Sequence, residues 1–544
     1  MKQKNKYLNL LIVMLVAIIS LPLVGYDSTE KVVRRADIAV LYTGDVHCVI
    51  DENIGYAGLA AFKSELEAEG VEVLLVDTGD AIQGTPMGSL SEGALPIKIM
   101  NHLGYSAMTL GNHEFDYGQA PLSTLSKEAH FPFLSLNFVD EATRKPVYRS
   151  YTIVERDGVK IAFVGVSTPK TLISSRPTHF MDKKGDYLYS FLQDKEGELL
   201  WETTQQVVDA ARKDGADYVI ALTHLGINSD TAPYLSNQLI ANTKGIDVVL
   251  DGHSHSIVEC ERVRSKDGKR VLLSSTGTEL SHIGYLLIGK DGNLSTGLIS
   301  DYAKKDAATV TYINSLKKEF EQQLKQPVAL VKNHLVTDHA ITGVRIVRNR
   351  ETNLGNLCAD AIRSEANADV AVMNGGGIRA SMKAGEITYG DVLNVFPFGN
   401  HIRTIEVTGQ QLLDALELSV SSFPAENGGF LQVSGLTFTF RTDIPTPVIK
   451  DNTGMFTGVK GKRRVQEVWI DKKPLEANKT YSLAGTDYTL GGGDGYAMFA
   501  DSRVLEGDVG LDFDALISFL RTGYLQNTSL YENPNGEGRI VAIP

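Results

Sequence analysis

Cysteine is scarce in this sequence, with three residues in a chain of 544. Cys48, Cys260 and Cys358 form no Cys-x-x-Cys pair and lie far apart in the sequence. This pattern excludes a small fold that is held together by a disulfide framework. The sequence is compatible with a single bridge between two of the three cysteines.

The chain also lacks an excess of basic residues. It has 53 Lys and Arg against 66 Asp and Glu, which gives a formal net charge of −13. A protein that binds a nucleic-acid polymer needs a basic stripe, so this function is not expected. Small anionic substrates stay possible, because a bound metal ion can reverse the local field.

The apolar run at the N-terminus is short for a membrane span. It covers Leu10–Ile19 and follows three basic residues, Lys2, Lys4 and Lys6. This order is typical of a cleaved export signal, which we assign to residues 1–25. The protein is therefore expected to be exported, to the periplasm or the cell surface. It would be held at the membrane only if this segment stayed uncleaved.

The length predicts two to four domains. From Asp37 to about Ile288, short apolar runs alternate with amphipathic segments, which indicates a layered α/β domain with a sheet covered on both faces. Asp306–Lys325 is polar and helix-prone, and a second α/β region follows it. We therefore expect domains at residues 36–305 and 331–544, joined by a linker helix at 306–330.

The apolar pattern also predicts individual elements. In the first region we expect strands at Ile38–Tyr42, Val71–Val76, Ala107–Leu110, Ile161–Val166, Tyr218–Leu222 and Asp247–Leu250, and helices at Leu59–Ala68 and Thr203–Lys213. In the second region we expect strands at Val370–Met373, Ile402–Val407, Leu436–Phe440 and Glu467–Ile470, and helices at Asn353–Ala366 and Gly409–Leu418. The segment Asp451–Lys462, with its Gly and Lys residues, is expected to be a mobile loop.

Five polar clusters follow directly after predicted strands of the first region. They are Asp45-Val46-His47, Asp77-Thr78-Gly79-Asp80, Asn112-His113, His224, and His253-Ser254-His255. Because ligand sites of α/β sheets gather at the carboxyl ends of strands, the five clusters are expected to meet. Asp45 and His47 have i,i+2 spacing, as do His253 and His255. In each pair, both side chains would point to one face of an extended chain.

These clusters supply seven candidate metal ligands: Asp45, His47, Asp80, Asn112, His224, His253 and His255. Mixed oxygen and nitrogen ligands suit Zn, Mn, Fe or Co better than Ca. Seven ligands exceed what one tetrahedral zinc needs, so we expect two divalent ions that share a carboxylate. Two such ions can hold both oxygens of an in-line displacement. The alternative is a set of unrelated loop residues, but five clusters at strand ends favour one site.

His113 stands next to a candidate ligand and would point away from it if the chain stayed extended. It is then a free acid or base, and Asp116 is close enough to orient its imidazole. The alternative is a turn in which Asn112 caps a following helix.

The motifs GDVH, DTGD, GNHEFD, THLG and GHSH, in this order, resemble those of calcineurin-like metallophosphoesterases. GNHEFDYG and NGGGIR narrow the resemblance to the 5′-nucleotidase family, which includes UDP-sugar hydrolases and 2′,3′-cyclic-nucleotide phosphodiesterases. The resemblance extends from about Ile38 to Tyr496. It implies an α+β four-layer metallophosphoesterase sandwich, followed by a second α/β domain that binds the substrate.

The resemblance also implies residue roles and a reaction. Asp45, His47 and His255 would hold one ion, Asn112, His224 and His253 the other, and Asp80 would bridge them. His113, oriented by Asp116, would stabilise the transition state or protonate the leaving oxygen. The implied activity is 5′-nucleotidase, which releases nucleoside and phosphate by attack of a metal-bound hydroxide.

The second region carries candidate groups for binding a nucleotide. Glycines in NGGGIR let the backbone approach a ligand, and Arg379 can contact phosphate or hydroxyl oxygens. Phe398 and Tyr488 lie in glycine-rich loops and could sandwich a planar base, although core packing is the alternative for each. With the resemblance, the expected substrate-binding residues are Arg348, Asn374, Gly376, Gly377, Arg379, Phe398, Tyr488 and Asp494. The substrate would then lie between the domains, with a hinge near Asp306–Lys332.

Other functions compatible with these residues are hydrolysis of 2′,3′-cyclic nucleotides, UDP-sugars or NAD by the same site. An alternative of a different class is a surface binding protein that has the fold but no turnover. The presence of all seven candidate ligands argues against this second alternative.

Overall fold

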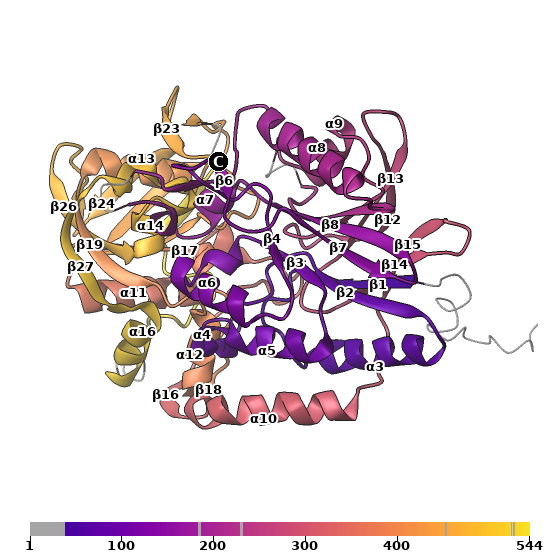
Figure 1. The fold of residues 1–544 in the computed structure, drawn as a ribbon. Coiled ribbons are helices and arrows are strands. Elements are labelled where there is room, and N and C mark those ends of the chain that lie inside the picture. The colour runs from indigo at the N-terminus through magenta and orange to yellow at the C-terminus, as the bar shows by residue number, and fades with distance from the viewer. Residues whose placement is uncertain (1–37, 183–185, 229–231, 452–453, 524, 526–527) are drawn as a thin grey trace, which may run out of the picture.

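The computed structural model describes residues 38–182, 186–228, 232–451, 454–523, 525 and 528–544 (Figure 1). The predicted export signal at residues 1–25 lies outside the described residues. Within those residues, no helix combines the length and the apolar character that crossing a membrane requires.

Two six-stranded sheets form the first part of the chain. One contains, in spatial order, β15 (Leu294–Ile299), β14 (Ile283–Ile288), β1 (Ile38–Thr43), β2 (Glu72–Asp77), β3 (Ala107–Thr109) and β4 (Phe133–Leu134). The other contains β12 (Ile257–Arg264), β13 (Arg270–Thr276), β11 (Val248–Asp251), β10 (Tyr218–His224), β8 (Val159–Ser167) and β7 (Tyr151–Arg156). Strands β1, β2 and β3 are parallel, as are β8, β10 and β11. All six predicted strands of this region are therefore confirmed.

The two sheets pack face to face because their strands are apolar on both sides. In β1, Val40 and Tyr42 face the second sheet and join a core that includes Phe163 and Leu250. The alternate residues, such as Leu41, belong to the core on the other side of the strand. This alternation produces a strand that is buried throughout.

Helices cover the outer face of each sheet. Helices α3 (Gly55–Ala68) and α5 (Ala94–Leu103) share a core with the first sheet, and α8 (Glu198–Lys213) and α9 (Ser236–Asn242) share one with the second. Figure 1 shows the four layers, with α3 and α5 at the bottom and α8 and α9 at the top. The expected four-layer sandwich is confirmed, and we call it the N-terminal unit (residues 38–299).

A long helix leads out of the N-terminal unit. Helix α10 (Ala307–Leu324) begins after Asp306, whose carboxylate accepts a hydrogen bond of 2.7 Å from the Thr309 amide. It runs along α3 and α5 in Figure 1, and the rings of Tyr312 and His102 stack with centroids 4.3 Å apart. The chain then enters β16 (Pro327–Val331), which pairs with β18 (Gly385–Thr388). The predicted helix is present at this position.

The remaining chain forms a second α/β unit, which we call the C-terminal unit (residues 327–544). Its main sheet contains, in spatial order, β20 (Leu431–Ser434), β17 (Val370–Asn374), β26 (Thr480–Thr486), β19 (His401–Thr408) and β27 (Arg503–Leu511). Helices α11 (Asn353–Ala366) and α16 (Asp512–Arg521) pack on one face, and α13 (Gly409–Ser419) packs on the other. A smaller sheet consists of β25 (Lys473–Pro474), β24 (Val465–Ile470), β21 (Leu436–Arg441) and β28 (Ile540–Ile543).

Two expectations are corrected or decided by the fold. The segment Asp451–Lys462 is not a loop throughout, because it contains β23 (Phe456–Val459), paired with β22 (Val448–Lys450). Phe456 packs against the core next to α13, which holds this segment in spite of its glycines and lysines. The three cysteines are all free, so no disulfide bridge is present among them.

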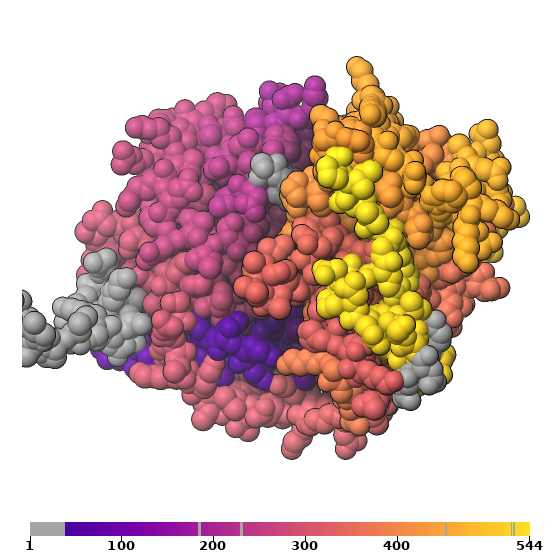
Figure 2. Space-filling view, turned by 180° about the vertical axis from the view of Figure 1, so that it is seen from behind, coloured from indigo at the N-terminus to yellow at the C-terminus, as the bar shows by residue number. Residues whose placement is uncertain are grey.

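The two units are in direct contact. Seen from behind in Figure 2, the indigo to pink surface of the N-terminal unit meets the orange and yellow surface of the C-terminal unit along a broad seam. One contact across it is the side-chain amide of Gln83, which donates to the carbonyl of Pro397 at 3.2 Å. This seam brings C-terminal residues to the carboxyl edge of the parallel strands.

Candidate metal centre

The five polar clusters meet at the carboxyl ends of β1, β2, β3, β10 and β11, as the sequence predicted. Ligand atoms lie within 4.8 Å of one another in three groups: Asp45, His47 and His255; His47, Asp80 and His113; and Asp80, His224 and His253. Asp80 and His47 each belong to two groups, so the three groups form one continuous site. The separate-loop alternative is therefore wrong.

The expectation of an extended chain at the two pairs with i,i+2 spacing was wrong. Asp45, His47, His253 and His255 all have positive φ values, between 51° and 76°, and so the chain is not extended there. Non-glycine residues in this region cost about 1–3 kcal/mol each and are common at functional sites. Backbone hydrogen bonds from Asp45 to Gly79, 2.9 Å, and from His47 to Asp80, 2.8 Å, hold the first of these loops.

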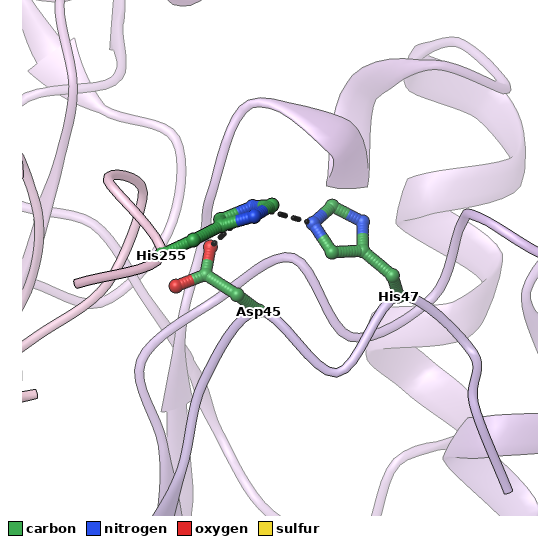
Figure 3. Close-up of side chains that lie close together, drawn as sticks. All are labelled: Asp45, His47 and His255. Atoms are coloured by element: carbon green, nitrogen blue, oxygen red, sulfur yellow. Dashed lines mark hydrogen bonds and ion pairs between the residues drawn. The ribbon is translucent and has the colours of Figure 1, made fainter. Parts of the chain in front are cut away.

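Figure 3 shows the first group, in which Asp45, His47 and His255 point toward one another. The Nε2 atoms of His47 and His255 are 3.1 Å apart, and Asp45 Oδ1 lies 3.8 Å from His255 Nε2. His47 Nδ1 lies 3.1 Å from the Gln83 carbonyl, so this nitrogen carries the hydrogen and Nε2 presents a lone pair. Burial lowers the pKa of His47 well below its usual range, and that of His255 to about 4. Neutral imidazoles are the form that binds a metal ion.

The second indication of a cation site is a buried nitrogen without a hydrogen-bond partner. His224 Nδ1 is 2.7 Å from the Thr78 carbonyl, which leaves Nε2 as the free nitrogen. Nε2 is 3.0 Å from Asp80 Oδ2, but its geometry gives no hydrogen bond with any described residue. Burial alone would lower the pKa of His224, whereas Asp80 and Asp45 raise it to about 10. The carboxylates therefore attract positive charge to this point, and the residues present fit a divalent cation.

Asn112 completes the ligand set of this region. Its backbone is helical, with φ −77° and ψ −32°, and it precedes the short helix η1 (His113–Phe115). The condition of an extended chain is thus not met here, and the alternative of a capping Asn is wrong, because its side chain makes no capping bond. Instead Asn112 Oδ1 lies 2.9 Å from His253 Nδ1. The amide is directed into the site.

Glycines allow the strand-end loops to approach each other. A Cβ atom on Gly111 would lie 2.2 Å from Asp80 Oδ1, and one on Gly79 would lie 2.6 Å from the Gly111 nitrogen. Gly79 also has φ +97°, which disfavours other residues. These two positions explain why glycine precedes Asp80 and Asn112.

Glu114 is a buried carboxylate whose role the sequence analysis missed, although it stands inside GNHEFD. It accepts hydrogen bonds from the amides of Asp80, Ala81 and Gly111, at 2.8, 2.8 and 2.7 Å. It therefore fixes the loop that carries Asp80 against the loop that carries Asn112. The sequence around Glu114 could not predict this role, because the backbone amides that it binds belong to two different loops.

His113 is paired with Asp116, as predicted. His113 Nδ1 is 2.6 Å from Asp116 Oδ2, and the Ser175 hydroxyl donates to Asp116 Oδ1 at 2.8 Å. Burial would lower the pKa of His113, but Asp116 and Asp80 raise it to about 9. The imidazole is thus held as a proton donor beside the candidate ligands.

The C-terminal unit contributes residues to the same site. The ring of Phe398 stacks on His113, with centroids 5.7 Å apart and planes inclined by 24°. The guanidinium of Arg379 lies 5.7 Å from the Phe398 ring centre, a cation–π distance. Core packing, the alternative for Phe398, is therefore wrong.

Tyr488 and Asp494 form a polar group of the C-terminal unit at its contact with the N-terminal unit. Tyr488 Oη lies 3.0 Å from Asp494 Oδ1 and 2.9 Å from the Ile173 carbonyl of the N-terminal unit. Asn374 donates to Asp494 Oδ2 at 2.8 Å. Burial raises the pKa of Asp494. Asn374, Asp494 and Tyr488 are thus brought together, as expected.

Arg348 and the glycines of NGGGIR lie beside this group. The Nε of Arg348 is buried and has no hydrogen-bond partner among the described residues. Burial lowers the pKa of Arg348 to about 9, and the positive charge of the nearby Arg379 contributes to this decrease. Gly376 and Gly377 belong to η5 (Gly375–Gly377), where a Cβ on Gly377 would lie 2.4 Å from the Met373 side chain. The Met373 methyl can move, but a Cβ on Gly375 would lie 2.3 Å from the Val347 carbonyl oxygen, so close backbone packing requires glycine at that position.

Comparison with known proteins agrees with this geometry. The family model "calcineurin-like phosphoesterase" matches residues 38–256, and "5′-nucleotidase, C-terminal domain" matches residues 332–501. A 5′-nucleotidase of Vibrio parahaemolyticus is 30% identical over 86% of this chain and 85% of that protein. The trifunctional nucleotide phosphoesterase protein YfkN of Bacillus subtilis is 30% identical over 93% of this chain, which spans only 35% of YfkN.

Solved structures give the same result. The crystal structure of a 5′-nucleotidase precursor from Thermus thermophilus matches with a TM-score of 0.73 and 26% identity, covering 93% of this chain and 99% of that chain. The fold, the site and the relatives lead to one conclusion. The chain belongs to the 5′-nucleotidase family and is a metal-dependent phosphoric ester hydrolase.

Proposed function

We propose that this protein is an exported 5′-nucleotidase, which hydrolyses a nucleoside 5′-monophosphate to nucleoside and phosphate. The observation that carries the proposal is the stacking of Phe398 on His113, with centroids 5.7 Å apart. It joins an aromatic ring suited to a base with a proton donor suited to a leaving oxygen. One small substrate can contact both units at this point.

Two divalent ions are proposed to bind to the candidate ligands. Asp45, His47 and His255 would hold one ion, and Asn112, His224 and His253 would hold the other, with Asp80 shared. The grouping of ligand atoms within 4.8 Å supports this assignment, because Asp80 belongs to two groups. When bound, such ions lower the pKa of water and neutralise charge on phosphoryl oxygens.

His113 is proposed as the general acid. In the displacement, water attacks phosphorus, the P–O bond to the nucleoside breaks, and the departing oxygen takes a proton from His113 Nε2. Asp116, at 2.6 Å from Nδ1, keeps the imidazole protonated and oriented. One proton of the attacking water stays with the phosphate product. The other is released and restores the proton on His113.

The C-terminal unit is proposed to bind the nucleotide. Arg348 and Arg379 are half-buried, and within the described part of the chain Arg348 Nε has no hydrogen-bond partner and Arg379 Nη1 contacts only the Gly376 carbonyl, at 3.5 Å. Phosphate oxygens match the planar donor arrangement of such side chains. Phe398 and Tyr488 would contact the base, and the other polar contacts would come from the residues around Asp494: Asn374, Gly376 and Gly377.

The test is a phosphate-release assay on a substrate panel. It would contain 5′-nucleotides, 2′,3′-cyclic nucleotides, UDP-glucose and NAD, with protein stripped by chelator and then supplied with Mn, Zn or Mg. We expect release from 5′-nucleotides that is lost with chelator and restored by at least one ion. Preference for a cyclic nucleotide, UDP-glucose or NAD would change the substrate class, and inactivity on every nucleotide would contradict the proposal.

Export and domain limits are further proposals from the sequence. The basic and apolar N-terminal segment supports removal of residues 1–25, and mass spectrometry of the mature N-terminus would test it. The units at residues 36–305 and 331–544 are proposed as separate domains joined by α10. Limited proteolysis would test these limits, with stable fragments expected on each side of residues 306–330.

A further inference from the structure

One segment of the N-terminal unit contacts both the catalytic pair and the C-terminal unit. It consists of α7 (Thr171–Ser174), Ser175, Arg176 and η2 (Pro177–Phe180). We call it the bridging segment (residues 171–180). None of its residues is a candidate ligand or a predicted substrate contact, and its sequence contains no motif that suggested a role.

On one side, the bridging segment holds the loop that carries His113 and Asp116. Ser175, which is 1% exposed, donates from its hydroxyl to Asp116 Oδ1 at 2.8 Å. His179 Nδ1 lies 2.9 Å from the carbonyl of Phe115, which stands between the two catalytic residues. Asp116 is thus held on one oxygen by Ser175 and bound to His113 by the other.

On the other side, Arg176 binds the C-terminal unit. Its Nη1 is 3.2 Å from Asp487 Oδ2, and its Nη2 donates to Asn400 Oδ1 at 3.2 Å. The Arg176 and Asp487 side chains are 14% and 6% exposed, so water screens this ion pair much less than a surface pair. A second link comes from Tyr488 Oη, which is 2.9 Å from the Ile173 carbonyl.

The partners of Arg176 are next to the proposed base-binding residues. Asp487 immediately precedes Tyr488, and its Oδ1 accepts a hydrogen bond of 3.1 Å from the His401 amide. Asn400 is two residues from Phe398, and its side-chain amide donates to Asp512 at 3.1 Å. The groups that bind Arg176 are therefore fixed to the parts of the C-terminal unit that would contact a nucleotide.

We propose that Arg176 is a positioning residue, which couples the docking of the C-terminal unit to the alignment of His113 and Asp116. The connection runs from Asp487 to Arg176, along one peptide bond to Ser175, and from Ser175 to Asp116. Apart from the peptide bond, each step is a hydrogen bond or ion pair of 3.2 Å or less, and Asp116 continues the connection to His113 at 2.6 Å. Losing the anchor at Arg176 would loosen Asp116, and an error of about 1 Å in such a position can lower a rate about 100-fold.

Hydrogen exchange tests this coupling without any substrate. In Arg176→Ala, amides of residues 113–118 are expected to exchange about tenfold faster than in the wild-type protein, in addition to those of residues 171–180. Arg144→Ala is the matched control, because Arg144 pairs with Glu141 on the surface at 2.6 Å. Unchanged exchange at residues 113–118 in Arg176→Ala would overturn the proposal, since the effect would then stop at the interface.

Kinetics provide the second test, which rests on the proposed nucleotidase activity. With adenosine 5′-monophosphate and Mn, Arg176→Ala is expected to lower kcat about 10- to 100-fold with unchanged metal content, when assayed below its melting temperature. Arg176→Lys is expected to recover part of this loss, because it keeps the charge beside Asp487. Ser175→Ala should lower kcat similarly, and the double variant should lose no more than the larger single loss.

Failure of the coupling proposal can be distinguished from failure of the proposed nucleotidase function. Additive losses in the double variant, or a change in KM alone, would overturn the coupling while leaving the nucleotidase proposal intact. A wild-type protein that is inactive on all nucleotides would contradict the proposed function, and hydrogen exchange would still decide the coupling.

Discussion

His224 Nε2 lies 3.0 Å from Asp80 Oδ2, with both side chains buried and no hydrogen bond between them. The pair comes from the ends of two strands in different sheets, β10 and β2. A nitrogen lone pair and a carboxylate at this separation repel each other unless positive charge is shared between them. A proton or a cation can supply that charge, and the surrounding histidines favour the cation.

The first prediction concerns Asp80. Asp80→Asn is expected to reduce the number of metal ions bound per chain and to lower the hydrolysis rate about 1,000-fold or more, because several kcal/mol of charge stabilisation are lost. Elemental analysis and phosphate release would measure the two effects. The control is Asp157→Asn, since Asp157 is exposed in a turn with φ 52°, where Asn is also tolerated. Unchanged turnover in Asp80→Asn would refute the shared-ligand assignment.

The second prediction concerns the catalytic pair. His113→Ala is expected to lower kcat about 10²- to 10⁴-fold while the metal content stays the same, because a general acid is lost without a ligand. A parallel loss of metal in elemental analysis would show that His113 is a ligand instead.

The third prediction concerns pH. Burial acts to lower the pKa of His113, and the Asp116 carboxylate acts to raise it. Asp116→Asn removes that charge, so His113 loses its proton at a lower pH. The alkaline limb of kcat/KM is therefore expected to move to lower pH in this variant. An alkaline limb at the wild-type position would exclude His113 as the group that titrates there.

The fourth prediction uses a matched pair at Tyr488. Tyr488→Ala removes the ring, whereas Tyr488→Phe removes only the hydroxyl near Ile173 and Asp494. Loss of a base stack is worth about 1–3 kcal/mol, which corresponds to a decrease in kcat/KM of roughly 5- to 150-fold. We expect this decrease for nucleotides in Tyr488→Ala and a smaller one in Tyr488→Phe. Equal losses in the two variants would show that the hydroxyl, and not the ring, is the important group.

The fifth prediction concerns stability in the C-terminal unit. Burial raises the pKa of Asp512 from 3.8 to about 7, although a hydrogen bond from Asn400 acts to lower it. A folded-state pKa above the unfolded value means stability that is complete below about pH 4 and lost as pH rises through about 7. The free energy of unfolding, measured by urea denaturation, should thus exceed that of Asp512→Asn by less and less across this window, with a total change of at most roughly 4 kcal/mol. A difference that is constant from pH 4 to pH 8 would contradict this.

Local patterns predicted much of the fold and of the site. The helix expected at Asn353–Ala366 has these bounds in the structure, because Thr352 caps its start and Asn367 adopts the left-handed conformation at its end. The candidate ligands were predictable for a related reason. Each follows an apolar strand of a parallel sheet, and parallel strands end at one edge, so their neighbours must meet there.

The tertiary structure decided what local spacing could not. The left-handed backbone at Asp45 and His255 depends on hydrogen bonds and packing between loops that are about 200 residues apart. The stacking of Phe398 on His113, and the link from Arg176 to Asp487, depend on how the N-terminal and C-terminal units dock. The sequence therefore determined which residues stand at the ends of the strands. Only three-dimensional packing determined which distant side chains touch, because such contacts leave no periodic trace along the chain.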